Sequence, residues 1–214
     1  KSFNEDSLKF VRKILFGGEG FPKMILLKMF RRFSSRIEFE NVYGPTECTC
    51  ICSSYKISEK DFEDMLELPP LGVIPKHFSF KLVDKGKEDK RKGELFLSGP
   101  QVGLGYYGDK EKTLTTFSHE QADLDMSSVI FYKTGDMVEI KSGGFMSFNG
   151  RKDFQIKHMG YRIELQEIEC ALSSIEGIVE CAVLYIKISE TLGQLEAFVS
   201  QDNRVSKQSI IEHL

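Results

Sequence analysis

The sequence predicts a mixed α/β and α+β fold, in which three segments of different texture follow one another. Apolar residues recur at helical spacing over 22–33, next to a short apolar strand. Short alternating runs separated by turn residues then dominate, and apolar residues recur at helical spacing again at 167–172. We therefore expect a partial α/β segment over 1–68, a β-barrel-like segment over 69–150 and a small α+β segment over 151–214.

In the first segment we expect a helix that turns into a strand over 7–16, an amphipathic helix over 22–33 opened by proline, and strands over 37–42 and 48–57. Cys48, Cys50 and Cys52 alternate, so on the last of these strands they would share one face. That face is either buried or a thiolate metal site. Because no neighbouring Cys or His completes a usual zinc spacing, we expect buried cysteines.

In the middle segment, strands are expected over 77–83 and 93–98 around a charged loop, and over 129–132, 137–140 and 145–149 with a hairpin turn at Gly143-Gly144. The sequence GLGYYG at 103–108 matches the pattern of dinucleotide-binding loops. The dinucleotide-binding fold needs a full helix and a second parallel strand after this loop. Only a short polar helix over 109–117 and a polar, strand-poor stretch over 118–128 follow, so we do not expect a dinucleotide site.

Composition excludes several classes of protein. The 214 residues can bury a core, and the net charge of −3 gives no reason to expect nucleic acid or a membrane surface as partner. No apolar run approaches the ~20 residues that span a bilayer. The polar N-terminus does not resemble a signal peptide, and an odd number of cysteines without one favours the cytoplasm. The start without Met and the interrupted last helix, from 205, suggest a piece of a longer chain.

The segment NVYGPTE at 41–47 places an aromatic ring, a tight turn, a hydroxyl and a carboxylate close together. Tyr43 can lie flat on a purine, and Gly44 with the following proline turns the backbone towards a ligand. Thr46 offers a hydroxyl to a phosphate, and Glu47 offers oxygen ligands to Mg²⁺. This combination suits a nucleoside triphosphate with its magnesium ion.

Polar residues further along the chain suit a sugar and phosphates. Asp136, expected on a tight turn between two strands, either serves that turn or accepts both hydroxyls of a ribose. Arg151 and Arg162 either face phosphate or ribose oxygens or are exposed residues of a linker. Gly160 permits a tight turn near a ligand.

Together these segments resemble the adenylate-forming, or AMP-binding, superfamily of acyl-CoA synthetases, firefly-type luciferases and amino-acid adenylation domains. The matching motifs occur in the family's order: GGE at 17–19, YGPTE at 43–47, GEL at 93–95, GYY at 105–107, YKTGD at 132–136 and GRxD at 150–153. The stretch 153–169 is most similar to D-alanine–carrier protein ligases, also called D-alanine–poly(phosphoribitol) ligases, and to the adenylation domains of peptide synthetases.

The resemblance implies the C-terminal part of the large adenylating domain followed by a small C-terminal domain. It implies a ligase that uses ATP and Mg²⁺ to form an aminoacyl-AMP and then passes the acyl group to the thiol of a phosphopantetheine carrier protein. Thr46 would contact the α-phosphate and Glu47 would hold Mg²⁺. The nucleotide would be bound by Gly17, Gly18, Glu19, Asn41, Tyr43, Gly44, Asp136 and Arg151, while Asp153 would be the hinge between domains and Gly160 and Arg162 would belong to the thiolation loop.

The sequence departs from the family in two respects. The glycine- and serine-rich phosphate loop and the C-terminal lysine of the family are absent, so we expect this polypeptide alone to be inactive and to dimerise through apolar surface left uncovered. Gly17 stands where D-alanine ligases usually carry Cys, which predicts a larger acyl pocket and leaves the amino acid open. An acyl-CoA synthetase-like ligase and a catalytically inactive nucleotide-binding module are the alternatives.

Overall fold

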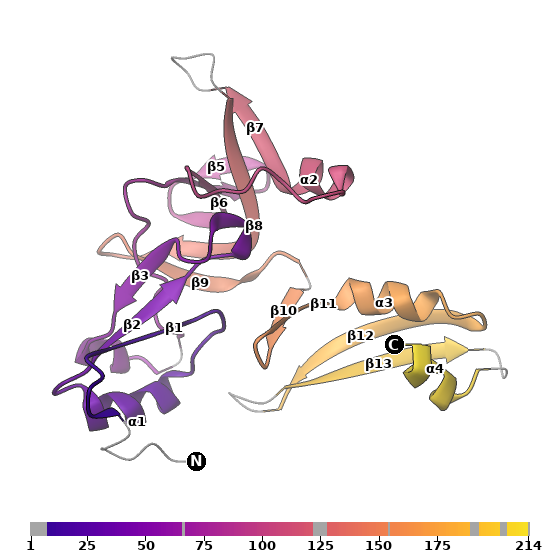
Figure 1. Cartoon of the computed structure of the whole chain (residues 1–214), viewed down its shortest axis with the longest axis horizontal. Coiled ribbons are helices and arrows are strands. Elements are labelled where there is room, and N and C mark those ends of the chain that lie inside the picture. The colour runs from indigo at the N-terminus through magenta and orange to yellow at the C-terminus, as the bar shows by residue number, and fades with distance from the viewer. Residues whose placement is uncertain are drawn as a thin grey trace. The chain divides into compact units, whose positions relative to one another are not determined.

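The computed structural model describes residues 8–65, 67–121, 128–153, 155–188, 193–201 and 205–213 (Figure 1). The chain divides into two compact units, Lys1–Lys152 and Asp153–Leu214, which are described separately. A further division of the first unit near residue 68 stays a prediction. The mixed α/β character, with few helices and mostly antiparallel strands, is as predicted.

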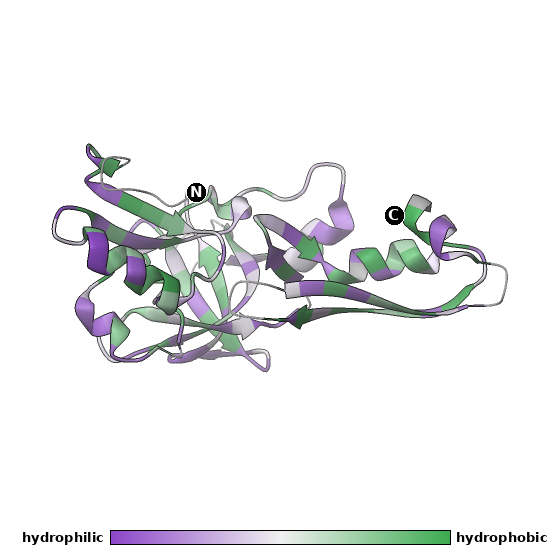
Figure 2. Ribbon diagram, turned by 90° about the horizontal axis from the view of Figure 1, so that it is seen from below, coloured by the Kyte–Doolittle hydropathy of each residue, from purple (hydrophilic) through white to green (hydrophobic). Residues whose placement is uncertain are grey.

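The first unit begins with a three-stranded sheet of order β1-β2-β3, formed by Lys13–Gly17, Glu38–Tyr43 and Ser53–Lys56. Strands β1 and β2 are parallel, and helix α1 (Lys23–Phe33) connects them. Figure 2 shows hydrophobic and hydrophilic residues interleaved along α1. Leu26, Phe30 and Phe33 of its apolar face form one buried cluster with Ile37, Phe39 and Ile57. The predicted α-helix before β1 is not seen in described residues 8–12, where only Leu8 is assigned to a 3₁₀ turn.

The predicted strand over 48–57 is wrong in its first half. Residues Thr46–Cys48 form a 3₁₀ turn, η2, and the backbone then enters the left-handed region at Thr49 (φ 57°) and Cys50 (φ 79°). Strand pairing resumes only at Ser53. The three cysteines therefore share no strand face: Cys48 and Cys52 are buried, as expected, but Cys50 is exposed.

A six-stranded antiparallel sheet follows, of order β5-β4-β6-β8-β7 with β9 paired to β8 (Figure 1). Its strands are β4 (Ser79–Asp84), β5 (Lys87–Asp89), β6 (Lys92–Ser98), β7 (Phe117–Gln121), β8 (Ser128–Ile140) and β9 (Met146–Arg151). The stretch predicted to be strand-poor over 118–128 contains most of β7, and the two strands predicted over 129–140 are one, β8. The hairpin turn at Gly143-Gly144 is confirmed.

The core of this sheet consists mainly of Phe78, Leu82, Leu95, Leu97, Phe117, Tyr132, Val138 and Met146. Between β6 and β7, helix α2 (Lys110–Thr116) has only seven residues and is capped by the side chain of Asp109. Strand β7 then runs antiparallel to β8, so the loop at 103–108 leads to no parallel βαβ unit. In the described residues after this loop, the strand pairing therefore differs from that of a dinucleotide-binding fold.

The second unit contains the hairpin of β10 (Gln155–His158) and β11 (Tyr161–Glu164), then α3 (Leu165–Ser173), β12 (Ile178–Lys187), β13 (Gly193–Gln201) and α4 (Lys207–His213). Helix α3 lies along the β12–β13 ribbon, and Leu165, Leu172 and Val183 are buried between them (Figure 1). The first hairpin was not predicted. In the described parts of both units, no helix has the length and apolar character needed to cross a membrane.

Candidate functional site

The loop after β2 is closed tightly upon itself. The amide of Cys52 donates to the carbonyl oxygen of Tyr43 (2.7 Å), and that of Cys48 donates to Pro45 (3.1 Å). A Cβ atom added at Gly44 would lie 2.0 Å from the carbonyl oxygen of Cys50. Glycine is therefore needed here for close approach of two backbone segments, which deepens the predicted role of Gly44 in the turn.

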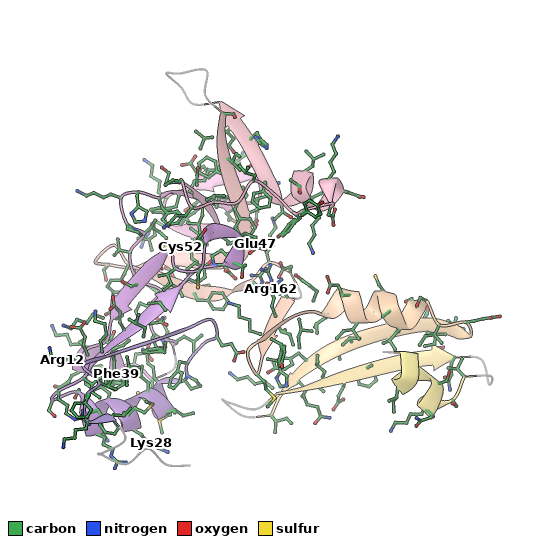
Figure 3. The ribbon with its side chains drawn as sticks, in the orientation of Figure 1. Arg12, Lys28, Phe39, Glu47, Cys52 and Arg162 are labelled. Atoms are coloured by element: carbon green, nitrogen blue, oxygen red, sulfur yellow. The ribbon has the colours of Figure 1, made fainter. Side chains whose placement is uncertain are left out.

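The catalytic candidates of this loop lie in η2. Thr46 is exposed at its first position, and Glu47 is half-buried. The Tyr106 hydroxyl donates to Glu47 Oε1 (2.7 Å), and the Gly103 amide donates to the Glu47 carbonyl oxygen (2.7 Å). The glycine-rich loop at 103–108 thus orients Glu47, which is labelled in Figure 3. The GYY motif could have pointed to Tyr106, but its contact was not predicted.

The buried carboxylate of Asp136 contacts two other candidate residues of the first unit, Tyr43 and Arg151. Tyr43 donates its hydroxyl to Asp136 Oδ2 (2.5 Å), and Arg151 Nη1 lies 2.6 Å from Asp136 Oδ1. Asp136 is only 8% exposed. Burial, and then the charge of Asp136, raise the pKa of Tyr43 well above its usual value, so the phenol remains a donor. The structure therefore brings together three residues that are distant in the sequence.

Asp136 does not lie on a turn between two strands, contrary to the prediction. It lies inside β8, where the pairing with both β6 and β9 shifts register. Thr134 Oγ1 donates to the carbonyl oxygen of Leu95 (2.7 Å) and accepts from the Asp136 amide (3.0 Å), and Gly135 has a φ of 73°. At this bulge, hydrogen bonds of the Thr134 side chain replace the regular strand pairing and orient the Asp136 carboxylate.

Asn41 is buried, and its Nδ2 donates to the carbonyl oxygens of Pro69 (3.3 Å) and Pro70 (2.8 Å). These bonds tie β2 to the proline segment and give Asn41 a structural role. A direct contact of Asn41 with nucleotide stays a prediction.

The GGE motif follows β1. A Cβ atom added at Gly17 would lie 2.0 Å from the carbonyl oxygen of Val42, so the missing side chain points at β2 rather than into open space. Contrary to the prediction, glycine at position 17 does not enlarge an acyl pocket in this backbone. Gly18 has a φ of 89°, and Glu19 is exposed in the turn. Their contacts with nucleotide stay predictions.

The remaining candidates belong to the second unit. Asp153 is its first residue, and Asp153 Oδ1 accepts from the Gln155 amide (3.2 Å). Gly160 has a φ of 86° in the turn between β10 and β11, and Arg162, marked in Figure 3, lies on β11. The hinge and thiolation roles of these residues stay predictions.

Magnesium would need oxygen ligands from both protein and nucleotide. Among the described residues, no group of three or more His, Cys, Asp and Glu side chains could hold a metal ion. Magnesium is usually bound by one or two carboxylates together with substrate phosphates and water. The half-buried Glu47 carboxylate fits that arrangement.

Comparison with known proteins places these motifs in one family. The AMP-binding enzyme family matches residues 1–107. The D-alanine–D-alanyl carrier protein ligase of Listeria monocytogenes serotype 4a (strain HCC23) is 34% identical over 95% of this chain and 39% of its own length. Zwittermicin A synthase ZmaJ of Bacillus cereus is 32% identical over 97% of this chain and 39% of its own length.

A solved structure agrees with these sequence matches. The structure of PA1221, an NRPS protein containing adenylation and PCP domains, is 27% identical, covers 98% of this chain and 42% of its own, and superimposes with a TM-score of 0.80. The chain thus spans about two fifths of the length of such relatives. With the motifs, the fold and these matches in agreement, the chain belongs to the AMP-binding enzyme family.

Proposed function

We propose that the natural protein containing this chain activates an amino acid with ATP and transfers it to a carrier protein. In the first step the amino-acid carboxylate attacks the α-phosphate, forming aminoacyl-AMP and releasing pyrophosphate. In the second step a phosphopantetheine thiol attacks the acyl carbon and AMP leaves. The buried Asp136 carboxylate, held by Tyr43 and Arg151, is the observation that carries this proposal.

Asp136 is suited to a ribose because its charge is already balanced. The Arg151 guanidinium offsets the cost of burying the carboxylate. A carboxylate oxygen has the capacity to accept more than one hydrogen bond, so both Asp136 oxygens can accept from a ligand as well as from Arg151 and Tyr43. Two adjacent ribose hydroxyls would donate to the Asp136 carboxylate, while Arg151 stays paired with Asp136 Oδ1. The Tyr43 hydroxyl is hydrogen-bonded to the same carboxylate, and the Tyr43 ring would stack on the adenine.

Glu47 and Thr46 would act at the phosphates. Glu47 is oriented by Tyr106 and would contribute a carboxylate oxygen to Mg²⁺, and the exposed Thr46 would donate to the α-phosphate. Magnesium, when bound, neutralises charge on the phosphates as pyrophosphate departs. The protein's own contribution is to hold these donors and acceptors in place before the reaction.

An amino acid is the favoured substrate class. Named relatives are a D-alanine–D-alanyl carrier protein ligase and a zwittermicin A synthase, and the sequence over 153–169 resembles amino-acid-activating enzymes. For the 214-residue polypeptide by itself, an inactive nucleotide-binding module is the second candidate. The reason is that the chain spans 39% of the length of the ligase that it matches.

Amino-acid-dependent exchange of pyrophosphate into ATP tests the proposal. The protein expressed from the natural reading frame and the 214-residue chain would be assayed with the standard amino acids, D-alanine, and fatty and aryl acids. We expect exchange with one amino acid for the natural protein and loss of exchange in Asp136→Asn. Exchange should be normal in Lys141→Met, which removes the partly exposed ion pairs of Lys141 with Glu67 and Glu139 at the end of β8. A folded natural protein that exchanges with none of these acids would refute the proposal.

A further inference from the structure

Glu94 is a buried carboxylate that the proposed mechanism does not use. It lies on β6 opposite Met137 of β8 and is only 5% exposed. Glu94 Oε1 accepts from the Gly135 amide (3.3 Å), and Glu94 Oε2 lies 2.7 Å from Lys152 Nζ. A buried acidic side chain is costly unless its charge is compensated, so these two partners indicate a built interaction rather than a solvated surface contact.

Both partners of Glu94 lie beside the nucleotide-binding candidates. Gly135 precedes Asp136, and Lys152 follows Arg151. The Lys152 amide also donates to the Gly135 carbonyl oxygen (2.8 Å). Gly135 is therefore held on both sides, through its N–H by Glu94 and through its C=O by Lys152. We call these three residues the bulge clamp.

The bulge clamp lies where regular pairing fails. The β6–β8 pairing shifts between Glu94 and Phe96, and the β8–β9 pairing shifts between Asp136 and Val138. With the ladder interrupted on both sides, the orientation of the Asp136 carboxylate depends on side-chain bonds at the bulge. Lys152 is also the last residue of the first unit, so the clamp holds the end of β9 immediately before the chain enters the second unit.

We propose that Glu94, through Lys152 and the Gly135 amide, is a positioning residue that holds Asp136 and Arg151 in register for binding the nucleotide ribose. This inference rests on the proposed function. It deepens it by assigning a role to a residue that need not touch the nucleotide. It predicts that weakening the clamp lowers affinity for AMP and ATP while the affinity for the amino acid is unchanged.

The variants Glu94→Gln and Lys152→Met test the clamp in the natural protein. Glutamine keeps an acceptor for the Gly135 amide but loses the charge. Lys152→Met removes a side chain that is itself 67% exposed but leaves the Glu94 carboxylate without its cation, so the melting temperature is measured for each variant. Each variant is expected to raise the Kd for AMP and the KM for ATP about tenfold, as for loss of one charged hydrogen bond. The double variant is expected to resemble the single ones, because both remove the same interaction.

Backbone amide hydrogen exchange, measured with and without AMP, tests the role of the bulge clamp without relying on enzyme activity. Backbone amides in 132–140 and 146–152 should exchange about tenfold faster in Glu94→Gln and Lys152→Met than in the unaltered protein or the Lys141→Met control. Unchanged exchange in both variants overturns the inference, and so does faster exchange that leaves the Kd for AMP unchanged. If the unaltered protein binds no AMP, the proposed function fails, and the nucleotide part of the inference fails with it. Exchange that is spread over the whole protein, with a lowered melting temperature, shows a merely structural role and also overturns it.

Discussion

The triad of Tyr43, Asp136 and Arg151 allows a quantitative prediction. Tyr43→Phe removes a buried hydroxyl that donates to a carboxylate at 2.5 Å. Hydrogen bonds to charged groups contribute about 1.5–3 kcal/mol. Because Arg151 still compensates Asp136, we expect about 2 kcal/mol of destabilisation, which in a domain of this size lowers the melting temperature by about 4–8 °C.

Arg151→Met should cost more, about 3–5 kcal/mol, because it leaves a buried carboxylate without its cation. The two variants share Asp136, so the double variant should deviate from additivity by about 0.5–3 kcal/mol. Urea unfolding of the unaltered protein, both single variants and the double variant measures this cycle directly. A Tyr43→Phe effect below about 0.5 kcal/mol, or an additive double variant, would refute the reasoning that one buried carboxylate links both residues.

Three further predictions concern other parts of the first unit. Gly44→Ala should destabilise by at least about 1–3 kcal/mol in denaturant titration, because the new Cβ would lie 2.0 Å from the carbonyl oxygen of Cys50; an effect within error would contradict the close approach. Asn41→Ala should cost about 1–3 kcal/mol in the same assay, because it leaves two buried proline carbonyls without their donor, whereas a neutral result would dismiss those bonds. Hydrogen bonding from Lys13 lowers the pKa of Glu38 to about 2, so the ionised Glu38 carboxylate stabilises the fold above pH 4.5, and this stabilisation is lost as the pH falls towards 2. The free energy of unfolding of Glu38→Gln should therefore depend less on pH between 4.5 and 2 than that of the unaltered protein. An equal pH dependence would contradict this effect of Glu38.

The sequence predicted the elements whose patterns are local. Helix α1 and strand β2 were placed to within a residue or two, because apolar spacing over 22–33 and 37–42 reflects burial against one neighbour. The strand predicted through Cys50 failed for a different reason. Alternation suggests an extended backbone, but the left-handed conformations at Thr49 and Cys50 are imposed by closure of the loop onto Gly44.

The sequence motifs named the candidate site residues but did not show their contacts. Tyr43, Asp136 and Arg151 were each named from motifs, yet nothing in the spacing shows that they meet at one carboxylate. The clamp residue Glu94 belongs to the GEL motif at 93–95 but was not named as a site residue, since its partners come from β8 and from the residue after β9. Such contacts depend on sheet order and register, which local periodicity does not determine.

Direct detection of the aminoacyl-AMP intermediate tests whether the natural protein activates an amino acid with ATP. The natural protein would be mixed with ATP, Mg²⁺ and the amino acid that supports pyrophosphate exchange, quenched within one turnover, and analysed by mass spectrometry for aminoacyl-AMP. We expect the adenylate to form stoichiometrically, to be absent in Asp136→Asn, and to disappear when a phosphopantetheine carrier protein is added. A folded, nucleotide-binding protein that forms no adenylate with any amino acid would contradict the account.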